Sequence, residues 1–183
     1  MPITPRNRGL LRSVYDNKAA ITVSSTWLNP DTLIKNKADN LLNFNSCEDC
    51  RWWSQSIANS YLIFTFDNEL TIAAYSLQST LSIYPKSWRV YYTIKDDENW
   101  QVLDYQKENT FLSVQYTTKK FHVKPTLVKK IKIIQLSSYN NNEDKYLNCF
   151  ALRRVEFFGI EEKCTIQRNK KSMFPFLITL IFS

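Results

Sequence analysis

Four cysteines are the residues whose type and spacing most directly suggest chemistry. Cys47 and Cys50 form a Cys-x-x-Cys pair, and Cys149 and Cys164 follow far downstream. A structural zinc site usually draws on two close pairs of ligands, whereas Cys149 and Cys164 are 15 residues apart with no histidine near them in sequence. A thioredoxin-like pair would need the start of a helix in an α/β protein, which the pattern lacks. We therefore expect free thiols, with a small loop disulfide under oxidation as the alternative.

A catalytic constellation is not apparent in the sequence. The single histidine, His122, lies in a strand-like stretch, and no Gly-x-Ser-x-Gly motif accompanies it. The carboxylate pair Asp96-Asp97 and the pair Glu161-Glu162 are charge runs typical of solvated turns. With 2 glycines in total, the chain cannot form a glycine-rich phosphate-binding loop. The sequence predicts a protein that is not an enzyme and that uses no organic cofactor.

The distribution of charge argues against nucleic acid as a partner. The formal net charge is +7, of which residues 1–20 contribute +3 and residues 161–183 contribute +2. Residues 21–160 hold 16 basic and 14 acidic side chains, so the body of the chain contributes only +2. A dedicated nucleic-acid-binding domain has a strong basic field over its body. We therefore expect no nucleic-acid partner.

Composition also divides the chain into three parts. Residues 1–18 have little periodicity and are expected to form an N-terminal arm, and residues 161–183 form a basic and apolar tail. The arm lacks the apolar stretch of a signal peptide, and no Asn-x-Ser/Thr sequon occurs, so we expect a reducing, cytoplasmic location. The apolar stretch 173–183 is far shorter than the roughly 20 residues that span a bilayer. It is either a final strand or floppy tail, or a weak anchor to a membrane surface.

Between the arm and the tail, the pattern is that of short strands. β-Branched and aromatic residues alternate with polar ones, and Asn, Asp, Ser or Pro punctuate the segments. A turn is expected at Asp67-Asn68, a break near Pro125, and a bulge at Arg153-Arg154. The segment Asn29–Leu42 is expected to be an irregular connection with one turn. The strands are expected at 21–25, 61–66, 70–77, 88–94, 100–105, 121–123, 128–136 and 149–158.

Many short strands without a long helical pattern predict an all-β protein, either a sandwich or a barrel. A sandwich needs large aromatic side chains facing inward, so four tryptophans are assigned to the core: Trp52, Trp53, Trp88 and Trp100. For Trp53 the alternative is that it faces the loop end. Six lysines between positions 119 and 132 alternate with apolar residues. They are expected to form the solvated face of the sheet, with anion or membrane binding as the alternative.

Four segments, in this order and spacing, carry a resemblance to a known family. They are Ile21–Ser25, Trp52-Trp53-Ser54, Pro85–Val90 followed by Glu98–Trp100, and Leu152–Gly159. They resemble the opening strand, the early tryptophan, the central hairpin and the closing strand of discoidin domains, also called coagulation factor V/VIII type C domains. The resemblance covers residues 19–160. It implies an eight-stranded antiparallel jelly-roll β-sandwich, which is galactose-binding-domain-like.

The resemblance also implies a function class. Members of this family bind sugars, phospholipid head groups or proteins through loops at one end of the sandwich, and the fold alone does not choose among them. We expect a non-catalytic module that recognises a carbohydrate or a protein partner. The alternative is a peripheral protein that binds an anionic membrane surface through loop aromatics and the C-terminal tail.

Three loops are the expected ligand contacts, because the family binds through them. The first holds Trp27, Leu28 and Asn29, where an exposed Trp-Leu pair would stack on a sugar or enter a bilayer interface. Trp27 packing inward is the alternative. The second and third loops supply donors and acceptors that can hydrogen-bond sugar hydroxyls or a carboxylate. These residues are Asn45, Asp49 and Arg51, and then Thr80 and Lys86. The alternative for the second loop is a solvated loop without a ligand, and the alternative for the third is an ordinary hairpin connection.

A calcium site is a further implication of the resemblance. Sugar-binding relatives carry an acidic turn and a glutamate on the last strand that together hold a structural calcium. Here the turn reads Asn43-Phe44-Asn45, and Glu156 is present. Calcium prefers six to eight oxygen ligands, several of them charged, so two amides in place of two carboxylates weaken the site. Asn43, Asn45 and Glu156 are the candidate ligands.

Overall fold

The computed structural model describes residues 9–11, 19–27, 37–41, 51–140 and 148–159. These residues form eight strands and one short 3-10 helix, which confirms the predicted all-β class. The elements are β1 (Ala19–Val23), η2 (Ala38–Leu41), β2 (Trp52–Trp53), β3 (Tyr61–Gln78), β4 (Ile83–Thr93), β5 (Gln101–Gln106), β6 (Thr118–Asn140), β7 (Ala151–Leu152) and β8 (Arg154–Gly159).

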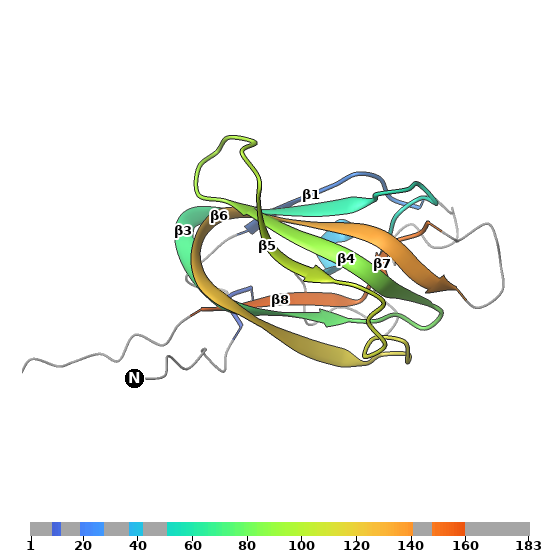
Figure 1. The fold of residues 1–183 in the computed structure, drawn as a ribbon. Helices are drawn as coiled ribbons and strands as arrows, with labels where there is room; N and C mark the ends of the chain where they lie inside the picture. Colours follow the sequence, from blue (N-terminus) through green and yellow to red (C-terminus); the bar gives the residue numbers. More distant parts are fainter. Residues whose placement is uncertain (1–8, 12–18, 28–36, 42–50, 141–147, 160–183) are drawn as a thin grey trace, which may run out of the picture.

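Two long strands take part in both layers of the sandwich (Figure 1). One layer has the order β1-β3-β6-β4-β5, and it uses residues 61–66 of β3 and residues 130–140 of β6. The other layer places β8 and β6 on either side of β3, and it uses residues 70–78 of β3 and 118–128 of β6. All these pairings are antiparallel. The layers are therefore two halves of one bent sheet.

The turn predicted at Asp67-Asn68 is wrong. Backbone pairing continues through these residues as a single strand, and the register of β3 against β6 shifts between Thr65 and Leu70. The polar residues were typical of a hairpin turn, but they lie where β3 crosses from one layer to the other and is exposed. A bend between layers needs the same solvated, irregular backbone as a turn, so composition alone does not separate the two.

The break predicted near Pro125 is also wrong, because β6 runs through it. Pro125 lies beside the register shift between Ile72 and Ala74 of β3, where a residue without an N–H is tolerated. The alternation of lysines with apolar residues slips by one position between Val128 and Ile131, where β6 bends as β3 does. Val128 and Ile131 are both buried, and the two lysines between them lie where β6 changes layer.

The closing strand is divided in two. β7 pairs with β2 in a separate two-stranded ladder, and β8 joins the edge of β3. Arg153 lies between them, and its backbone N–H donates to the carbonyl of Gln78 at 2.9 Å. The predicted bulge at Arg153-Arg154 is therefore a step from one ladder to another.

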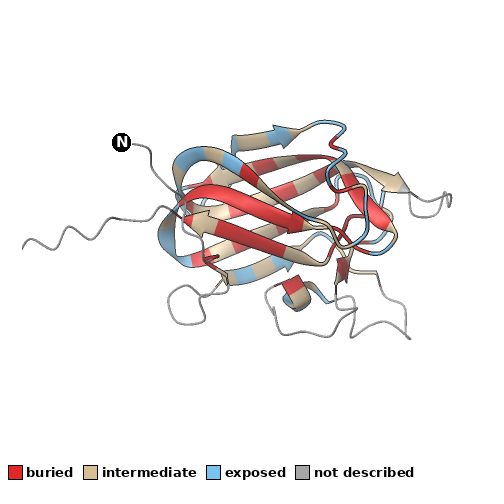
Figure 2. Ribbon diagram, turned by 90° about the horizontal axis from the view of Figure 1, so that it is seen from below, coloured by how far each residue is buried: buried red, intermediate tan, exposed pale blue. Residues whose placement is uncertain are grey.

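The interior between the layers is largely aromatic. Phe157 of β8 meets Phe64 and Phe66 of β3 edge-on, with ring centroids 5.1 and 5.7 Å apart. Trp52 and Trp88 are fully buried in the same cluster. Figure 2 shows buried residues along the strands and exposed ones at the bends. Alternating inward positions of β3, β6 and β8 thus build one core.

Two of the four tryptophans assigned to the core lie outside this cluster. Trp53 is half-buried and packs against a small second cluster made by Ile83, Cys149 and Ala151. Trp100 precedes β5 and is also half-buried, with the Lys132 ammonium 5.5 Å from its ring centroid. The prediction is wrong for Trp100, because the hairpin that carries it lies at the outer edge of the five-stranded layer.

A polar chain crosses the core beside these rings. The buried Trp88 Nε1–H donates to the Tyr75 hydroxyl at 3.0 Å, and this hydroxyl donates to Asp104 Oδ2 at 2.6 Å. Burial, and then the hydrogen bond to Asp104 and its negative charge, raise the pKa of Tyr75 well above its usual range. The phenol therefore remains a donor and links the two layers through β3, β4 and β5.

Residues 9–11, part of the expected N-terminal arm, dock on the edge of β8. The Leu10 N–H donates to the Phe157 carbonyl at 2.7 Å, and the Leu10 side chain is buried in the main core. Both glycines of the chain lie at this junction. A Cβ at Gly9 would overlap the Glu156 side chain, and a Cβ at Gly159 would lie 3.6 Å from Leu10. Close approach of the backbone therefore requires the small residue at Gly9.

Candidate functional site at the loop end

Several connecting segments meet at the end of the sandwich where β4 begins (Figure 1, right). The Trp27 N–H donates to the Trp53 carbonyl at 2.8 Å, and the Ser54 N–H donates to the Phe150 carbonyl at 2.9 Å. The Phe150 N–H in turn donates to Ser54 Oγ at 2.8 Å. These bonds hold residues 24–27, 51–56 and 148–151 as one rim. The expected ligand end is therefore a structured surface in the part of the chain that is described.

Two tryptophans lie on this rim. Trp27 and Trp53 are both half-buried, and both pack against the cluster of Ile83, Cys149 and Ala151. Trp27 therefore packs partly inward, as in the alternative to an exposed loop tip. Its neighbours in the predicted set, Leu28 and Asn29, lie outside the described residues.

Arg51 is the predicted ligand residue that the structure places most clearly. Its guanidinium carbon lies 4.8 Å from the centroid of the Trp53 ring, and its carbonyl accepts a hydrogen bond from Asn40 Nδ2 at 3.1 Å. The Nε atom is shielded from solvent and has no hydrogen-bond partner. An aromatic face and a planar set of N–H donors therefore stand together beside β2.

A second arginine, Arg153, has the same surroundings and was not predicted as a ligand contact. Its guanidinium carbon lies 4.8 Å from the centroid of the Tyr116 ring, and its Nε is likewise shielded and without a hydrogen-bond partner. The sequence signal was the arginine doublet that interrupts the closing strand. The doublet predicts a bulge, because a bulge accounts for the break in the alternation of polar and apolar residues, and a bulge needs no ligand.

Thr80 and Lys86 have other roles in this structure. Thr80 is fully buried, and its hydroxyl donates to the Ile83 carbonyl at 2.8 Å, so it fixes the β3–β4 turn and offers no surface to a ligand. The Lys86 ammonium lies 3.7 Å from Glu108 Oε1 and 5.3 Å from the Tyr139 ring centroid. The remaining predicted contacts, Asn45 and Asp49, lie outside the described residues.

The described residues do not assemble a calcium site. Asn43 and Asn45 lie outside them, and no group of three or more His, Cys, Asp or Glu side chains gathers within them. Glu156 is almost fully buried, and its Oε1 accepts the N–H of Leu11 at 2.7 Å and of Phe157 at 3.0 Å. Both N–H donors bond to the same carboxylate oxygen. Glu156 thus holds the N-terminal segment.

The other chemically suggestive residues give no catalytic arrangement within the described chain. Cys149 is a free, buried thiol; burial raises its pKa, partly opposed by a hydrogen bond with Ser56. His122 is exposed on β6 in the other layer. The remaining cysteines, Cys47, Cys50 and Cys164, lie outside the described residues.

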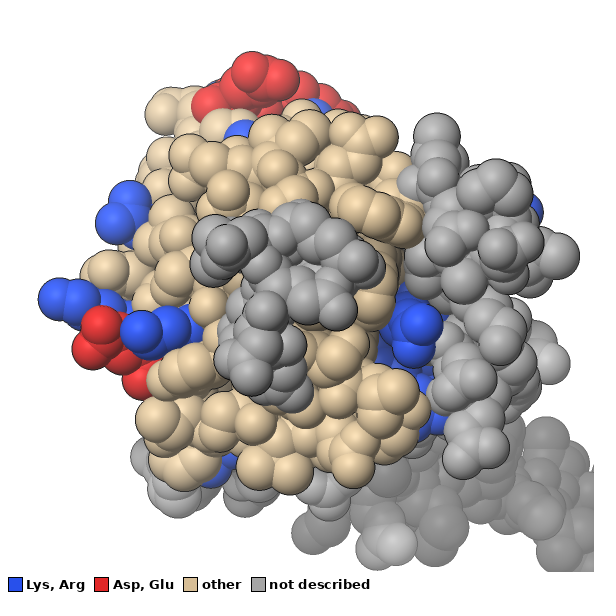
Figure 3. All heavy atoms as spheres, turned by 90° about the vertical axis from the view of Figure 1, so that its right-hand side faces the viewer, with Lys and Arg blue, Asp and Glu red and all other residues tan. Residues whose placement is uncertain are grey.

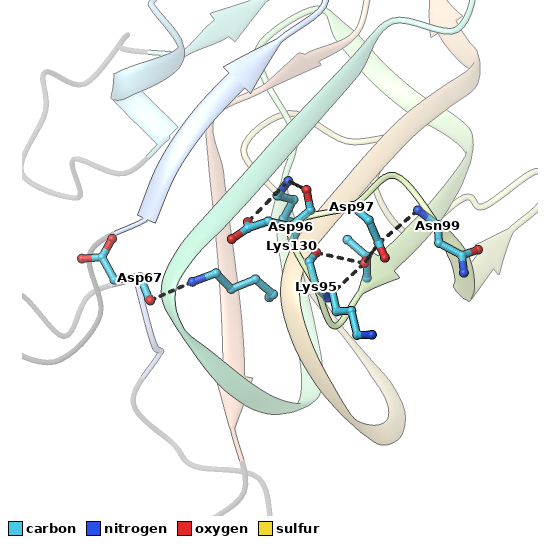
Figure 4. Close-up of polar contacts among 8 residues, drawn as sticks. Asp67, Lys95, Asp96, Asp97, Asn99 and Lys130 are labelled. Atoms are coloured by element: carbon cyan, nitrogen blue, oxygen red, sulfur yellow. Dashed lines mark hydrogen bonds and ion pairs between the residues drawn. The ribbon is translucent and has the colours of Figure 1, made fainter.

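A shallow, charged groove lies between the bend of β3 and the β4–β5 hairpin, lined by residues 67–69, 94–96 and Lys129. Figure 4 shows hydrogen bonds and an ion pair around it. The Lys129 ammonium donates to the Asp67 carbonyl at 2.8 Å, and the Lys130 ammonium lies 3.5 Å from Asp96 Oδ1. These contacts tie the bend of β3 and the β4–β5 hairpin to β6.

Comparison with known proteins identifies the fold. No family model and no curated protein match the sequence. Among solved structures, the module CpGH89CBM32-5 from Clostridium perfringens, in complex with GalNAc-β-1,3-galactose, has a TM-score of 0.60 at 10% identity, covering 77% of this chain and 95% of that chain. The chain has the discoidin-like, galactose-binding-like fold. This confirms the predicted sandwich.

Two further structures with this fold are also solved with saccharides. The CBM32 module of AlyQ, in complex with 4,5-unsaturated mannuronic acid, has a TM-score of 0.58 at 13% identity, covering 76% of this chain and 93% of that chain. Chitosan-binding module 2 of a Paenibacillus sp. IK-5 chitosanase/glucanase, in complex with chitotriose, has a TM-score of 0.58 at 11% identity, covering 76% and 95%. At these identities the similarity concerns the fold of this chain.

Proposed function

We propose that this chain is a non-catalytic module that binds carbohydrate at the loop end of its sandwich. The observation that carries the proposal is the Arg51 guanidinium stacked on Trp53 at the rim where the loops meet. Modules of the same fold are solved with a disaccharide, a uronic acid derivative and chitotriose, which supports the same ligand class here. Fold alone would not choose the ligand, so the side chains at the rim matter.

The chemistry of the rim suits a sugar. An indole presents an apolar face to the C–H side of a sugar ring, and its neighbouring guanidinium offers donors to hydroxyls in fixed directions. Trp27 and Trp53 form the apolar part, and Arg51 supplies the donors. The hydrogen bonds between residues 24–27, 51–56 and 148–151 fix the rim before a ligand arrives, which limits the entropy lost on binding.

A glycan array with three proteins tests this proposal. The parent chain is expected to bind a defined set of immobilised glycans, and Arg51→Ala and Trp53→Ala are each expected to weaken that signal at least tenfold. Arg89→Ala is the matched control, because Arg89 also stacks on an aromatic ring, Tyr105 at 4.9 Å, but on the outer face of the five-stranded layer. No glycan signal together with a reproducible protein partner would favour a protein adaptor instead.

A second candidate, binding to a membrane surface, has one observation in its favour. Three large apolar side chains are strongly exposed on neighbouring loops at this end: Leu81 (48%), Phe111 (59%) and Val114 (60%). The Lys119 ammonium lies 4.0 Å from the Phe111 ring centroid. Apolar tips flanked by cations are typical of insertion at an anionic interface. Among the described residues, no helix is long and apolar enough to cross a bilayer.

Liposome sedimentation separates the two candidates. If the loops insert, Phe111→Ser with Val114→Ser is expected to abolish sedimentation of the full chain with vesicles containing phosphatidylserine. Val102→Ser is the control, because Val102 is equally exposed (58%) but lies on β5. Equal sedimentation of both variants would contradict insertion through these loops.

A further inference from the structure

Two guanidinium groups without acceptors flank the proposed carbohydrate site. Arg51 directly precedes β2, and Arg153 directly follows β7. Because Trp52 pairs with Leu152 in the antiparallel β2–β7 ladder, the two arginines belong to the same end of that ladder. The ladder ends at this pair, and two like charges at the end of a ladder repel each other unless an opposite charge lies near them.

Neither side chain has a hydrogen bond or ion pair with the residues that the structure describes. Each guanidinium stacks on a ring, Arg51 on Trp53 and Arg153 on Tyr116, both at 4.8 Å. Each Nε is nevertheless shielded from solvent and has no acceptor. A shielded donor on a charged group is costly to leave unpaired, and native structures rarely keep one without a reason. The neighbouring Arg154 differs, because its Nη1 donates to the Arg153 carbonyl at 2.8 Å.

The described acidic residues do not supply the missing acceptors. Glu156 accepts backbone N–H groups at the β8 edge, and Glu108 lies beside Lys86. Figure 3 faces the loop end and shows Lys and Arg atoms at several places on it, with the visible Asp and Glu atoms at the top and left. Among the described residues, the arginine end of the β2–β7 ladder therefore holds cationic donors without an acidic partner.

We propose that the ligand of this site is an acidic saccharide whose carboxylate is bound by Arg51 and Arg153. This inference rests on the proposed carbohydrate function and names its substrate class. A guanidinium presents parallel N–H donors that match the two oxygens of a carboxylate, and such charge-assisted bonds are about twice as strong as neutral ones. A uronic acid residue bound at the rim beside Trp53 would bring its carboxylate within reach of the guanidinium that stacks on that ring.

A matched pair of ligands tests the role of charge. Isothermal titration calorimetry compares trigalacturonate with its methyl ester, which keeps the ring and linkage but removes the negative charge. The parent chain is expected to bind the acid at least tenfold more tightly than the ester, and the preference should shrink as salt is raised. Equal affinity for the acid and the ester would overturn the inference.

Variants assign the preference to the two arginines. Arg51→Gln and Arg153→Gln are each expected to lower the affinity for the acid about tenfold, and the double variant should no longer distinguish acid from ester. Arg89→Gln removes a stacked arginine from the outer sheet face and should leave the preference unchanged. A preference that survives in the double variant would place the acid group elsewhere and overturn the assignment. Unchanged unfolding transitions would show that the variants remain folded.

The failure of this inference is distinguishable from failure of the proposed function. If the parent chain binds neutral glycans on the array and binds acid and ester equally, the carbohydrate function stands and the acidic substrate class is wrong. If it binds neither trigalacturonate nor any glycan, both fail. Binding to phosphatidylserine vesicles that is lost in Arg51→Gln and Arg153→Gln, without any binding of trigalacturonate, would show that the arginines take a lipid head group, which also overturns the inference.

Discussion

A methyl group at Gly9 would test how the N-terminal segment is held against the sandwich. In Gly9→Ala, the new Cβ overlaps the Cγ, Cδ and Oε2 atoms of Glu156, so one of the two groups must move. The cheapest relief is rotation of the Glu156 side chain, which gives up the N–H donors of Leu11 and Phe157. Leaving such buried groups unpaired costs about 1–3 kcal/mol. We expect the free energy of unfolding to fall by that amount.

Urea denaturation followed by tryptophan fluorescence measures this change, and the chain contains its own control. Gly159→Ala places a Cβ 3.2 Å from the Thr71 carbonyl oxygen and 3.6 Å from Leu10, which a shift of a few tenths of an ångström relieves. Its expected effect is within about 0.5–1 kcal/mol of zero, because alanine also reduces the entropy of the unfolded chain. Gly9→Ala is therefore expected to lower the free energy of unfolding more than Gly159→Ala does.

A double variant makes the test specific. In the Glu156→Ala background the overlap disappears, so Gly9→Ala should cost little, and the two substitutions should couple strongly. Equal stability of Gly9→Ala, Gly159→Ala and the parent would refute the docking of residues 9–11 on β8.

Three other properties follow from the structure. Tyr75→Phe removes the acceptor of the buried Trp88 N–H and should lower the free energy of unfolding by about 1–3 kcal/mol in urea titrations; no change would contradict the polar chain in the core. Hydrogen bonds from the Thr93 hydroxyl and from the Asn99 N–H lower the pKa of Asp97 below its ordinary 3.8. The ionised carboxylate therefore stabilises the folded state above pH 3.8, and this contribution is lost as the pH falls through the lowered pKa. NMR titration should therefore find the pKa of Asp97 closer to 3.8 in Thr93→Val than in the parent. Because burial raises the pKa of the Cys149 thiol, iodoacetamide should modify it slowly in the native protein and rapidly in denaturant; fast native labelling, read by mass spectrometry of that peptide, would count against its burial.

The fold class could be predicted because alternation with a period of two is a local property. Each segment rich in aromatic and β-branched residues needed no information from distant parts of the chain to be recognised as a strand. The path of the strands was less predictable. Asp67 and Pro125 have the composition of loops, and pairing with a neighbouring strand is what keeps both in continuous strands.

The candidate site was predicted only in part, for a similar reason. Arg51 was identified because the resemblance assigns ligand contacts to its loop. Arg153 lies 102 positions further along the chain, and only the β2–β7 ladder brings it to the same rim. Thr80 illustrates the opposite error: its hydroxyl suits a ligand, but the turn it caps encloses it. Sequence indicates which donors exist, and burial decides which of them a ligand can reach.

The bends of β3 and β6 have a mechanical consequence. Since each of these strands belongs to both faces of the sandwich, no seam exists along which the faces could peel apart. Separating the two layers would therefore require breaking strand pairs on both sides of each bend.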